Sequence, residues 1–198
     1  MTRRTWLIGA ALAIAGGVGV HETLRAMAHA DEKLSTPGVG NFGRMNPHLY
    51  RGAQPTPAGF VSLKNLGVDT IVRLSLGEEG GAAEETLVTG LGMHFVSLPW
   101  SAEHDPEPEQ VVTFLRLLHD NDQRTVFVHC KAGADRTGVM IAVSRIALDH
   151  WSPDRAIDEM KAFHYYYVFL PHLQRYVEAF PAAMASNPDL QRLLGARH

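Results

Sequence analysis

Cysteine is almost absent from this chain of 198 residues, in which Cys130 is the single thiol. One thiol cannot form an intramolecular disulfide or a cysteine zinc cluster, so the sequence excludes both. Long runs of one charge are also missing, and the formal net charge is −3. That charge balance gives no indication of a nucleic-acid partner, and we expect none.

Metal-ligand motifs and sequence repeats are lacking as well. The 11 histidines are scattered, without a His-x-x-x-His or Glu-x-x-His pair on an expected helix, so we expect no metal and no other cofactor. Hydrophobic residues make up 45% and charged residues 20% of the chain, a composition typical of a soluble globular protein. The length suits one domain with its own core, and we expect a monomer.

The first thirty residues differ from the rest. Arg3 and Arg4 precede the uncharged, mostly apolar stretch Thr5–Val20, and a more polar stretch then ends in Ala28-His29-Ala30. This order predicts an export signal at residues 1–30, with cleavage after Ala30. The apolar stretch is shorter than the ~20 residues of a membrane-spanning helix, so an uncleaved N-terminal anchor is the second interpretation. The expected compartment is the periplasm or the exterior.

Two export routes are compatible with this segment. Arg3-Arg4 resembles the twin-arginine signal, although Ile8 occupies the place of the basic residue that usually follows the apolar pair. Adjacent arginines also occur in ordinary Sec signals, and the sequence leaves both routes open.

The body of the chain alternates expected strands and helices after a Gly-, Pro- and Asn-rich segment, 31–47, which we expect to be a flexible lead-in. Expected strands are 49–52, 69–75, 93–98 and 125–129; expected helices are 57–66, 84–91, 109–119, 136–149 and 152–197, the last with breaks near Pro171 and Pro188. Alternation of this kind predicts an α/β domain, a central mixed or parallel sheet flanked by helices.

The segment His129–Gly138 lies between the most hydrophobic expected strand and a helix. A loop that leads into a helix N-terminus directs several backbone N–H groups at one point, with the positive end of the helix dipole behind them. Gly133 allows a tight turn without a Cβ atom, and Gly138 allows close packing in the first helical turn. The pattern predicts a phosphate-binding loop between a central strand and a helix.

Within this loop the residue types indicate phosphoryl transfer. Cys130 lies at the base of the loop, where amide dipoles and Arg136 favour its thiolate form. The Arg136 guanidinium can grip two phosphoryl oxygens and stabilise charge as it develops. Thr137 can donate its hydroxyl to the departing sulfur. We expect His129 to fix the loop through hydrogen bonds rather than to act as a base.

The pattern His129-Cys130-x-x-Gly133-x-x-Arg136-Thr137-Gly138 resembles the signature of the cysteine-dependent protein-tyrosine phosphatase superfamily. The segment from Leu49 to about Phe180 is similar in layout to its compact dual-specificity branch, which has many exported bacterial members. The resemblance implies that residues 48–198 form the phosphatase domain, that Cys130 forms a phosphocysteine, and that no metal takes part. It also implies that the loop residues bind the phosphate: Lys131, Ala132, Gly133, Ala134, Asp135 and Arg136.

The resemblance further implies an aspartic acid on a separate loop that protonates the leaving group. Asp105, in the acidic segment 99–108, is the candidate by residue type. Glu103 and Glu107 flank it and stay open as alternatives, as does a merely solvated acidic loop.

The substrate is less well defined by the sequence. A phosphotyrosine-containing protein is the first expectation; a phosphoinositide or inositol phosphate is the second, since Lys131 and Asp135 occur at these positions in relatives that act on such compounds. An inactive phosphate-binding module is a third reading. A sulfur-transfer enzyme is a fourth, but it gives no reason for Arg136. Arg51 and Arg73 either line the site or form ion pairs.

The aromatic run His164–Phe169 is the last feature that the sequence singles out. We interpret it as a packing turn between two C-terminal helices rather than as a binding surface.

Overall fold

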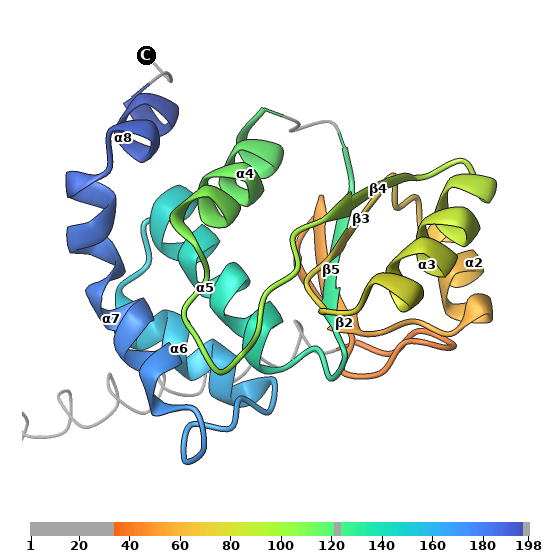
Figure 1. The fold of residues 1–198 in the computed structure, drawn as a ribbon, viewed down its shortest axis with the longest axis horizontal. Coiled ribbons are helices and arrows are strands. Elements are labelled where there is room, and N and C mark those ends of the chain that lie inside the picture. The colour runs from red at the N-terminus through yellow and green to blue at the C-terminus, as the bar shows by residue number, and fades with distance from the viewer. Residues whose placement is uncertain (1–33, 121–123, 196–198) are drawn as a thin grey trace, which may run out of the picture.

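A five-stranded mixed sheet organises the molecule (Figure 1). The computed structural model describes residues 34–120 and 124–195, so the predicted export signal lies outside the described residues. The strand order is β1-β2-β5-β3-β4, with β1 antiparallel to β2 and the other neighbours parallel. The strands are β1 Gly43–Asn46, β2 Leu49–Ala53, β3 Thr70–Arg73, β4 His94–Ser97 and β5 Val126–Cys130. The predicted α/β class is confirmed, and the strand that ends in Cys130 is central.

Helices cover both faces of this sheet. Helices α2 and α3 lie on one face and α4 to α8 on the other, as Figure 1 shows. Their bounds are α2 Pro57–Asn65, α3 Glu78–Gly90, α4 Pro108–His119, α5 Asp135–Leu148, α6 Pro153–Ala162, α7 Pro171–Ser186 and α8 Pro188–Gly195. None of the helices in the described ranges has the length and apolar character needed to cross a membrane.

Two hydrophobic cores result, one on each face. The larger core joins the sheet to the helices around α5 and includes Leu74, Trp100, Phe114, Met140 and Phe180. The smaller core lies under α2 and α3 and includes Phe42, Tyr50, Phe60, Ile71 and Phe127. Because α5 runs between the sheet and the helices α6 and α7, it is buried along most of its length. The helix that follows the phosphate loop is thus held on several sides.

Local sequence signals explain where helices begin. Thr56 caps α2, its hydroxyl accepting from the Gly59 N–H, and Pro57 occupies the first turn. Ser152 caps α6 in the same way, followed by Pro153. The predicted breaks near Pro171 and Pro188 are confirmed, since α7 and α8 begin there.

The structure differs from the sequence prediction over residues 31–47, which were expected to be a flexible lead-in. Within the described part of this segment, Gly43–Asn46 pair with β2 as the edge strand β1, and Val39, Phe42 and Met45 are buried. Apolar residues at these positions cover the sheet edge, which the abundance of Gly, Pro and Asn concealed.

Helix α3 also begins earlier than expected, at Glu78 rather than near Glu84, and runs through Gly80 and Gly81. Glycine costs about 1 kcal/mol per position in a helix. The cost has a local reason here: a Cβ atom on Gly81 would lie 3.3 Å from the guanidinium of Arg73. Gly81 lets the helix pass close over this buried arginine.

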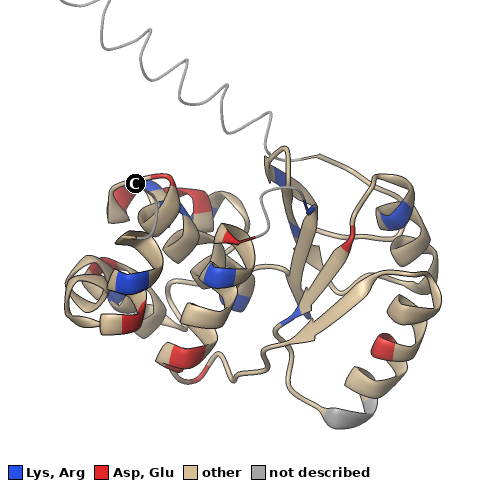
Figure 2. Ribbon diagram, turned by 90° about the horizontal axis from the view of Figure 1, so that it is seen from above, with Lys and Arg blue, Asp and Glu red and all other residues tan. Residues whose placement is uncertain are grey.

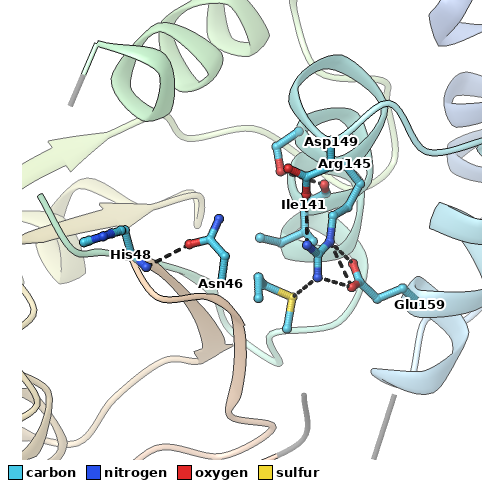
Figure 3. A network of polar contacts seen from close by, with 8 residues as sticks. Asn46, His48, Ile141, Arg145, Asp149 and Glu159 are labelled. Carbon is cyan, nitrogen blue, oxygen red and sulfur yellow. Dashed lines mark hydrogen bonds and ion pairs between the residues drawn. The ribbon is translucent and has the colours of Figure 1, made fainter. Parts of the chain in front are cut away.

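A buried ion network fastens α5 to α6, at the end of α5 away from the phosphate loop (Figure 3). Arg145 pairs with Glu159 at 2.7 Å and with Asp149 at 2.9 Å, and its guanidinium lies 4.2 Å from the centre of the Trp151 ring. In the nearby β1–β2 turn, the His48 N–H donates to the side chain of Asn46. These contacts fix α5 as a rigid support for the residues at its start.

Candidate active site

The phosphate loop occupies the expected junction of strand and helix. Strand β5 ends at Cys130, which is buried, and α5 begins at Asp135. On the way, Lys131 and Ala132 are exposed while Gly133 and Ala134 are buried. The Gly138 N–H donates to the Ala134 carbonyl at 2.7 Å, which starts the helix inside the signature. The predicted nucleophile therefore lies just before the N-terminus of α5.

Gly133 is the tightest point of the loop. Its φ of +66° lies in the left-handed region, and a Cβ atom there would lie 2.3 Å from the carbonyl carbon of Gly52. No side chain fits in that space, because the loop packs directly on the backbone at the end of β2. The sequence-based explanation for this glycine, a tight turn without a Cβ, is confirmed and gains a second cause in the close approach of β2.

Two side chains hold the carbonyl of Gly133. Arg51 donates from Nη2 at 2.8 Å and Asn41 from Nδ2 at 3.0 Å. Asn41 also donates to the Phe163 carbonyl, and the Arg51 guanidinium lies 4.1 Å from the centre of the Phe163 ring. Because a trans peptide points its N–H away from its carbonyl, the Ala134 N–H faces away from Arg51 and Asn41. These two side chains therefore fix the orientation of the peptide group between Gly133 and Ala134.

Sequence reasoning missed Asn41 altogether and placed Arg51 only as a residue that lines the site or pairs. Asn41 lies in the segment expected to be flexible, and its positive φ of 48° is tolerated by Asn better than by most residues. The neighbouring glycines at 38 and 40 were the available signal, since they mark a chain that turns closely against another segment.

Beneath the loop, His129 belongs to a buried polar network. Its Nε2 lies 2.7 Å from Glu84 Oε1, and its ring stacks on Phe127. Glu84 also accepts from Gln54 at 2.6 Å and pairs with Arg73 at 3.4 Å. The expectation that His129 fixes the loop through hydrogen bonds agrees with this arrangement.

Of the two roles considered for Arg73, the structure shows the ion pair. Besides Glu84, it donates to the carbonyls of Leu76 and Gly77, which shape the chain between β3 and α3. Glu84, the centre of the network, was not predicted. Its spacing four residues before the buried Val88 places both on one helix face and could have indicated that it points inward.

Arg136 lies in the first turn of α5, as predicted. Its Nη1 is within 3.3 Å of the Trp100 carbonyl and 3.5 Å of the Leu74 carbonyl. The guanidinium therefore reaches from the helix to the carboxyl end of β3 and to the start of the acidic segment 99–108. A fork held at this place can bind phosphoryl oxygens above the loop.

Thr137 is fully buried, and its Oγ1 has no hydrogen-bond partner among the described residues. A buried hydroxyl without a partner costs about 1–3 kcal/mol. The unused hydrogen bond suits the role expected for it, donation to the sulfur of Cys130.

The acidic segment 99–108 packs against α7. The Ala102 carbonyl lies 3.0 Å from His172 Nε2, and Asp105 is near Tyr176. Burial, and then the charge of Asp105, raise the pKa of Tyr176 to about 12. Glu107 is the N-cap of α4, its N–H donating to Gln110 Oε1. Asp105, Glu103 and Glu107 all have exposed side chains, so Asp105 stays a prediction as the proton donor.

The aromatic run agrees only in part with its interpretation as a packing turn between two C-terminal helices. Tyr165 is buried, but the four residues that follow it are exposed, with relative solvent accessibilities from 54% to 78%. The run touches the phosphate loop through Asp135, whose Oδ1 accepts from the Tyr166 N–H at 3.0 Å. The run lies between α6 and α7 as expected, and Tyr165 packs in the core, but the four residues after Tyr165 do not.

Comparison with known proteins agrees with this geometry. Residues 40–164 match the family model described as DSP-PTPase phosphatase fused to NAD+ kinase. The chain is 29% identical over 155 residues to the dual specificity protein phosphatase TpbA of Pseudomonas aeruginosa, covering 78% of this chain and 68% of that protein. It is 25% identical over 129 residues to the inositol diphosphatase DSP4 of Arabidopsis thaliana, covering 62% and 63% respectively.

A solved structure extends the likeness to three dimensions. The crystal structure of a serine-for-cysteine variant of P. aeruginosa TpbA in complex with phosphotyrosine has a TM-score of 0.61 and 27% identity, covering 74% of this chain and 91% of that one. The family model spans all five strands of the sheet, the phosphate loop and α5. With its signature in the matching strand–loop–helix geometry, the chain belongs to the dual-specificity-phosphatase-like bacterial branch of the cysteine-dependent protein-tyrosine phosphatase superfamily.

Proposed function

We propose that this chain hydrolyses phosphotyrosine in proteins, with Cys130 as nucleophile, Arg136 as phosphate clamp and Asp105 as general acid. The observation that carries the proposal is the placement of Cys130 at the end of the central strand, with Arg136 in the first turn of the helix that follows. The family membership and the phosphotyrosine complex of TpbA support it.

The reaction has two steps. The Cys130 thiolate attacks phosphorus and forms an S–P bond, the P–O bond to the tyrosine ring breaks, and Asp105 gives its proton to the departing oxygen. Water then attacks phosphorus and returns a proton to Asp105, while the S–P bond breaks and the thiolate is restored. Backbone N–H groups of residues 131–136 and the Arg136 fork stabilise the phosphoryl oxygens in both steps.

The test is hydrolysis of p-nitrophenyl phosphate by the full chain in the presence of EDTA. We expect turnover by the parent, none by Cys130→Ser, and a severe loss in Arg136→Lys, because a point charge cannot replace the bidentate fork. A phosphocysteine should be trapped by rapid acid quench and detected by mass spectrometry. A folded, reduced parent without turnover would favour the phosphate-binding module instead.

A second substrate class has one observation in its favour. Lys131 is exposed on the phosphate loop, where it can meet a further phosphate, and the relative DSP4 is named an inositol diphosphatase. Relative kcat/KM values on a phosphotyrosine peptide and on soluble inositol phosphates separate the two classes.

For the N-terminus we propose that residues 1–30 direct export to the periplasm or the exterior. The charge, apolar core and Ala28-His29-Ala30 ending of the segment support the proposal. Cell fractionation followed by N-terminal sequencing tests it: a mature chain that begins at Asp31 is expected. An intact Met1 in a membrane fraction would identify an anchor, and a cytoplasmic location would contradict export.

A further inference from the structure

Four consecutive large side chains are exposed beside the phosphate loop, and we call them the aromatic shelf: Tyr166, Tyr167, Val168 and Phe169. Their exposed fractions are 58%, 54%, 68% and 78%. Single exposed apolar residues are common on protein surfaces, whereas a contiguous group of this kind marks an interaction site more often.

The shelf has a defined shape. Tyr165, buried just before it, donates its hydroxyl to the Leu170 carbonyl and accepts from the Gln174 N–H. The N–H groups of Phe169 and Leu170 both donate to the Tyr166 carbonyl, and the rings of Tyr166 and Phe169 lie 6.3 Å apart. A preformed surface loses little conformational freedom when it binds a ligand.

The shelf is attached to the phosphate loop through Tyr166, whose N–H donates to Asp135, the residue directly before the phosphate clamp Arg136. Three residues before the shelf, the C-cap of α6 is also held to the loop, because Asn41 bridges the carbonyls of Gly133 and Phe163. A phosphorylated chain that places its phosphate over Cys130 therefore has the shelf alongside.

The charges near the site favour a polypeptide over an anionic membrane as the ligand of the shelf. The acidic segment 99–108 has three exposed carboxylates, those of Glu103, Asp105 and Glu107. Acidic and basic residues are interspersed over the helices α4 to α8, on the same face of the sheet as the shelf (Figure 2). A mixed surface of this kind does not attract an anionic membrane, which needs a basic cluster.

We propose that the aromatic shelf binds apolar side chains that neighbour the phosphotyrosine in a polypeptide substrate. This inference rests on the proposed function, and it adds that the preferred substrates have apolar residues next to the phosphotyrosine. Burying such a side chain against Tyr166 and Phe169 removes apolar surface of both partners from water.

The test measures binding by fluorescence anisotropy, with the full chain carrying Cys130→Ser so that peptides are not consumed. Two labelled phosphotyrosine peptides differ only at the positions flanking the phosphotyrosine, with Leu at both or Gly at both. We expect about tenfold tighter binding of the Leu peptide, which corresponds to about 1.4 kcal/mol. The double variant Tyr166→Ser/Phe169→Ser should bind both peptides equally.

The matched control is Val61→Ser/Leu66→Ser, two side chains of α2 and its C-cap with 44% and 46% exposure on the other face of the sheet. It should keep the preference for Leu. Equal binding of both peptides to the parent, or a preference that survives in the shelf variant, overturns the proposal. So does shelf-dependent binding to phosphatidylglycerol vesicles in place of the peptide preference.

Turnover of p-nitrophenyl phosphate by the chain with Cys130 intact reports separately on the proposed function. Turnover without a Leu preference removes the shelf proposal alone, whereas a Leu preference without turnover removes the proposed hydrolysis alone.

Discussion

His129 and Glu84 are 45 residues apart in sequence, and their side chains meet at 2.7 Å in the interior, immediately before the nucleophile. Through this contact α3, on one face of the sheet, supports a loop whose helix, α5, lies on the other face (Figure 1). Glu84 is also the partner of Arg73 and Gln54, so one carboxylate joins the ends of β2, β3 and β5.

Replacing Glu84 should therefore damage both stability and turnover. Glu84→Ala leaves the buried Arg73 charge without its carboxylate, and we expect a loss of about 3–5 kcal/mol in the free energy of unfolding. We expect kcat on p-nitrophenyl phosphate to fall by up to about 100-fold as the loop shifts. Urea unfolding and initial rates check this. The neighbouring exposed Glu85 is the control, and Glu85→Ala should change stability by less than about 0.5 kcal/mol.

Gly133→Ala should distort the loop where it packs against the end of β2. The added Cβ would overlap the backbone of Gly52 at 2.3 Å, so we expect a loss of at least about 3 kcal/mol and a fall in kcat/KM of about 100-fold. Gly67 has a similar positive φ of +83° but open space around its Cβ position. Gly67→Ala should cost only the backbone strain, about 1–2 kcal/mol, with kcat/KM unchanged. Equal effects of the two substitutions would show that the contact with β2 is unimportant.

The general acid can be identified from the dependence on leaving group. Asp105→Asn should lower kcat/KM on a phosphotyrosine peptide, which reports the step that expels the leaving group, by about 10²–10⁴-fold. The loss of kcat/KM should be much smaller on p-nitrophenyl phosphate, whose leaving group departs without a proton. Glu103→Gln and Glu107→Gln should leave the kcat/KM values on both substrates near those of the parent. Because Glu107 is the N-cap of α4, urea unfolding of Glu107→Gln is measured alongside. A larger loss in Glu103→Gln than in Asp105→Asn would transfer the role to Glu103.

Tyr176 should make the protein sensitive to alkali. Burial and the charge of Asp105 raise its pKa from 10.0 to about 12, so the folded state favours the neutral phenol. This stabilisation is complete below pH 10 and is lost as the pH rises through 12, amounting to about 3 kcal/mol. In Tyr176→Phe the free energy of unfolding should decline less steeply over that interval. Ultraviolet titration should show one phenol fewer ionising near pH 12, and an unchanged titration curve would contradict the assignment.

The sequence predicted the elements that carry local signals. Thr56-Pro57 and Ser152-Pro153 define helix starts by capping chemistry, and the apolar β-branched run before Cys130 defines the central strand. The signature placed Cys130 and Arg136 correctly at the junction of β5 and α5, because their spacing is set within one loop.

Contacts between distant segments could not be predicted in this way. Arg51 reaches the loop because β2 pairs with β5 in a particular register, and Asn41 because the chain before β1 lies against the end of β2, where the Ala53 N–H donates to the Gly40 carbonyl. Strand order of this kind does not follow from a single sequence. The exposure of Tyr166 and Phe169 was missed for a similar reason, since their apolar character is equally typical of a core. Glu84 was missed because buried carboxylates are rare and depend on partners from other elements.

The contacts of Asn41 determine how far this enzyme can be truncated from its N-terminus. Asn41 joins the carbonyls of Gly133 and Phe163, which follow it by 92 and 122 residues. A fragment that starts at residue 48 would retain every residue of the catalytic signature, yet it would lack β1 and this amide. Truncation, tagging or domain grafting should therefore preserve the chain from residue 34 onward, because the minimal catalytic unit is longer than its signature suggests.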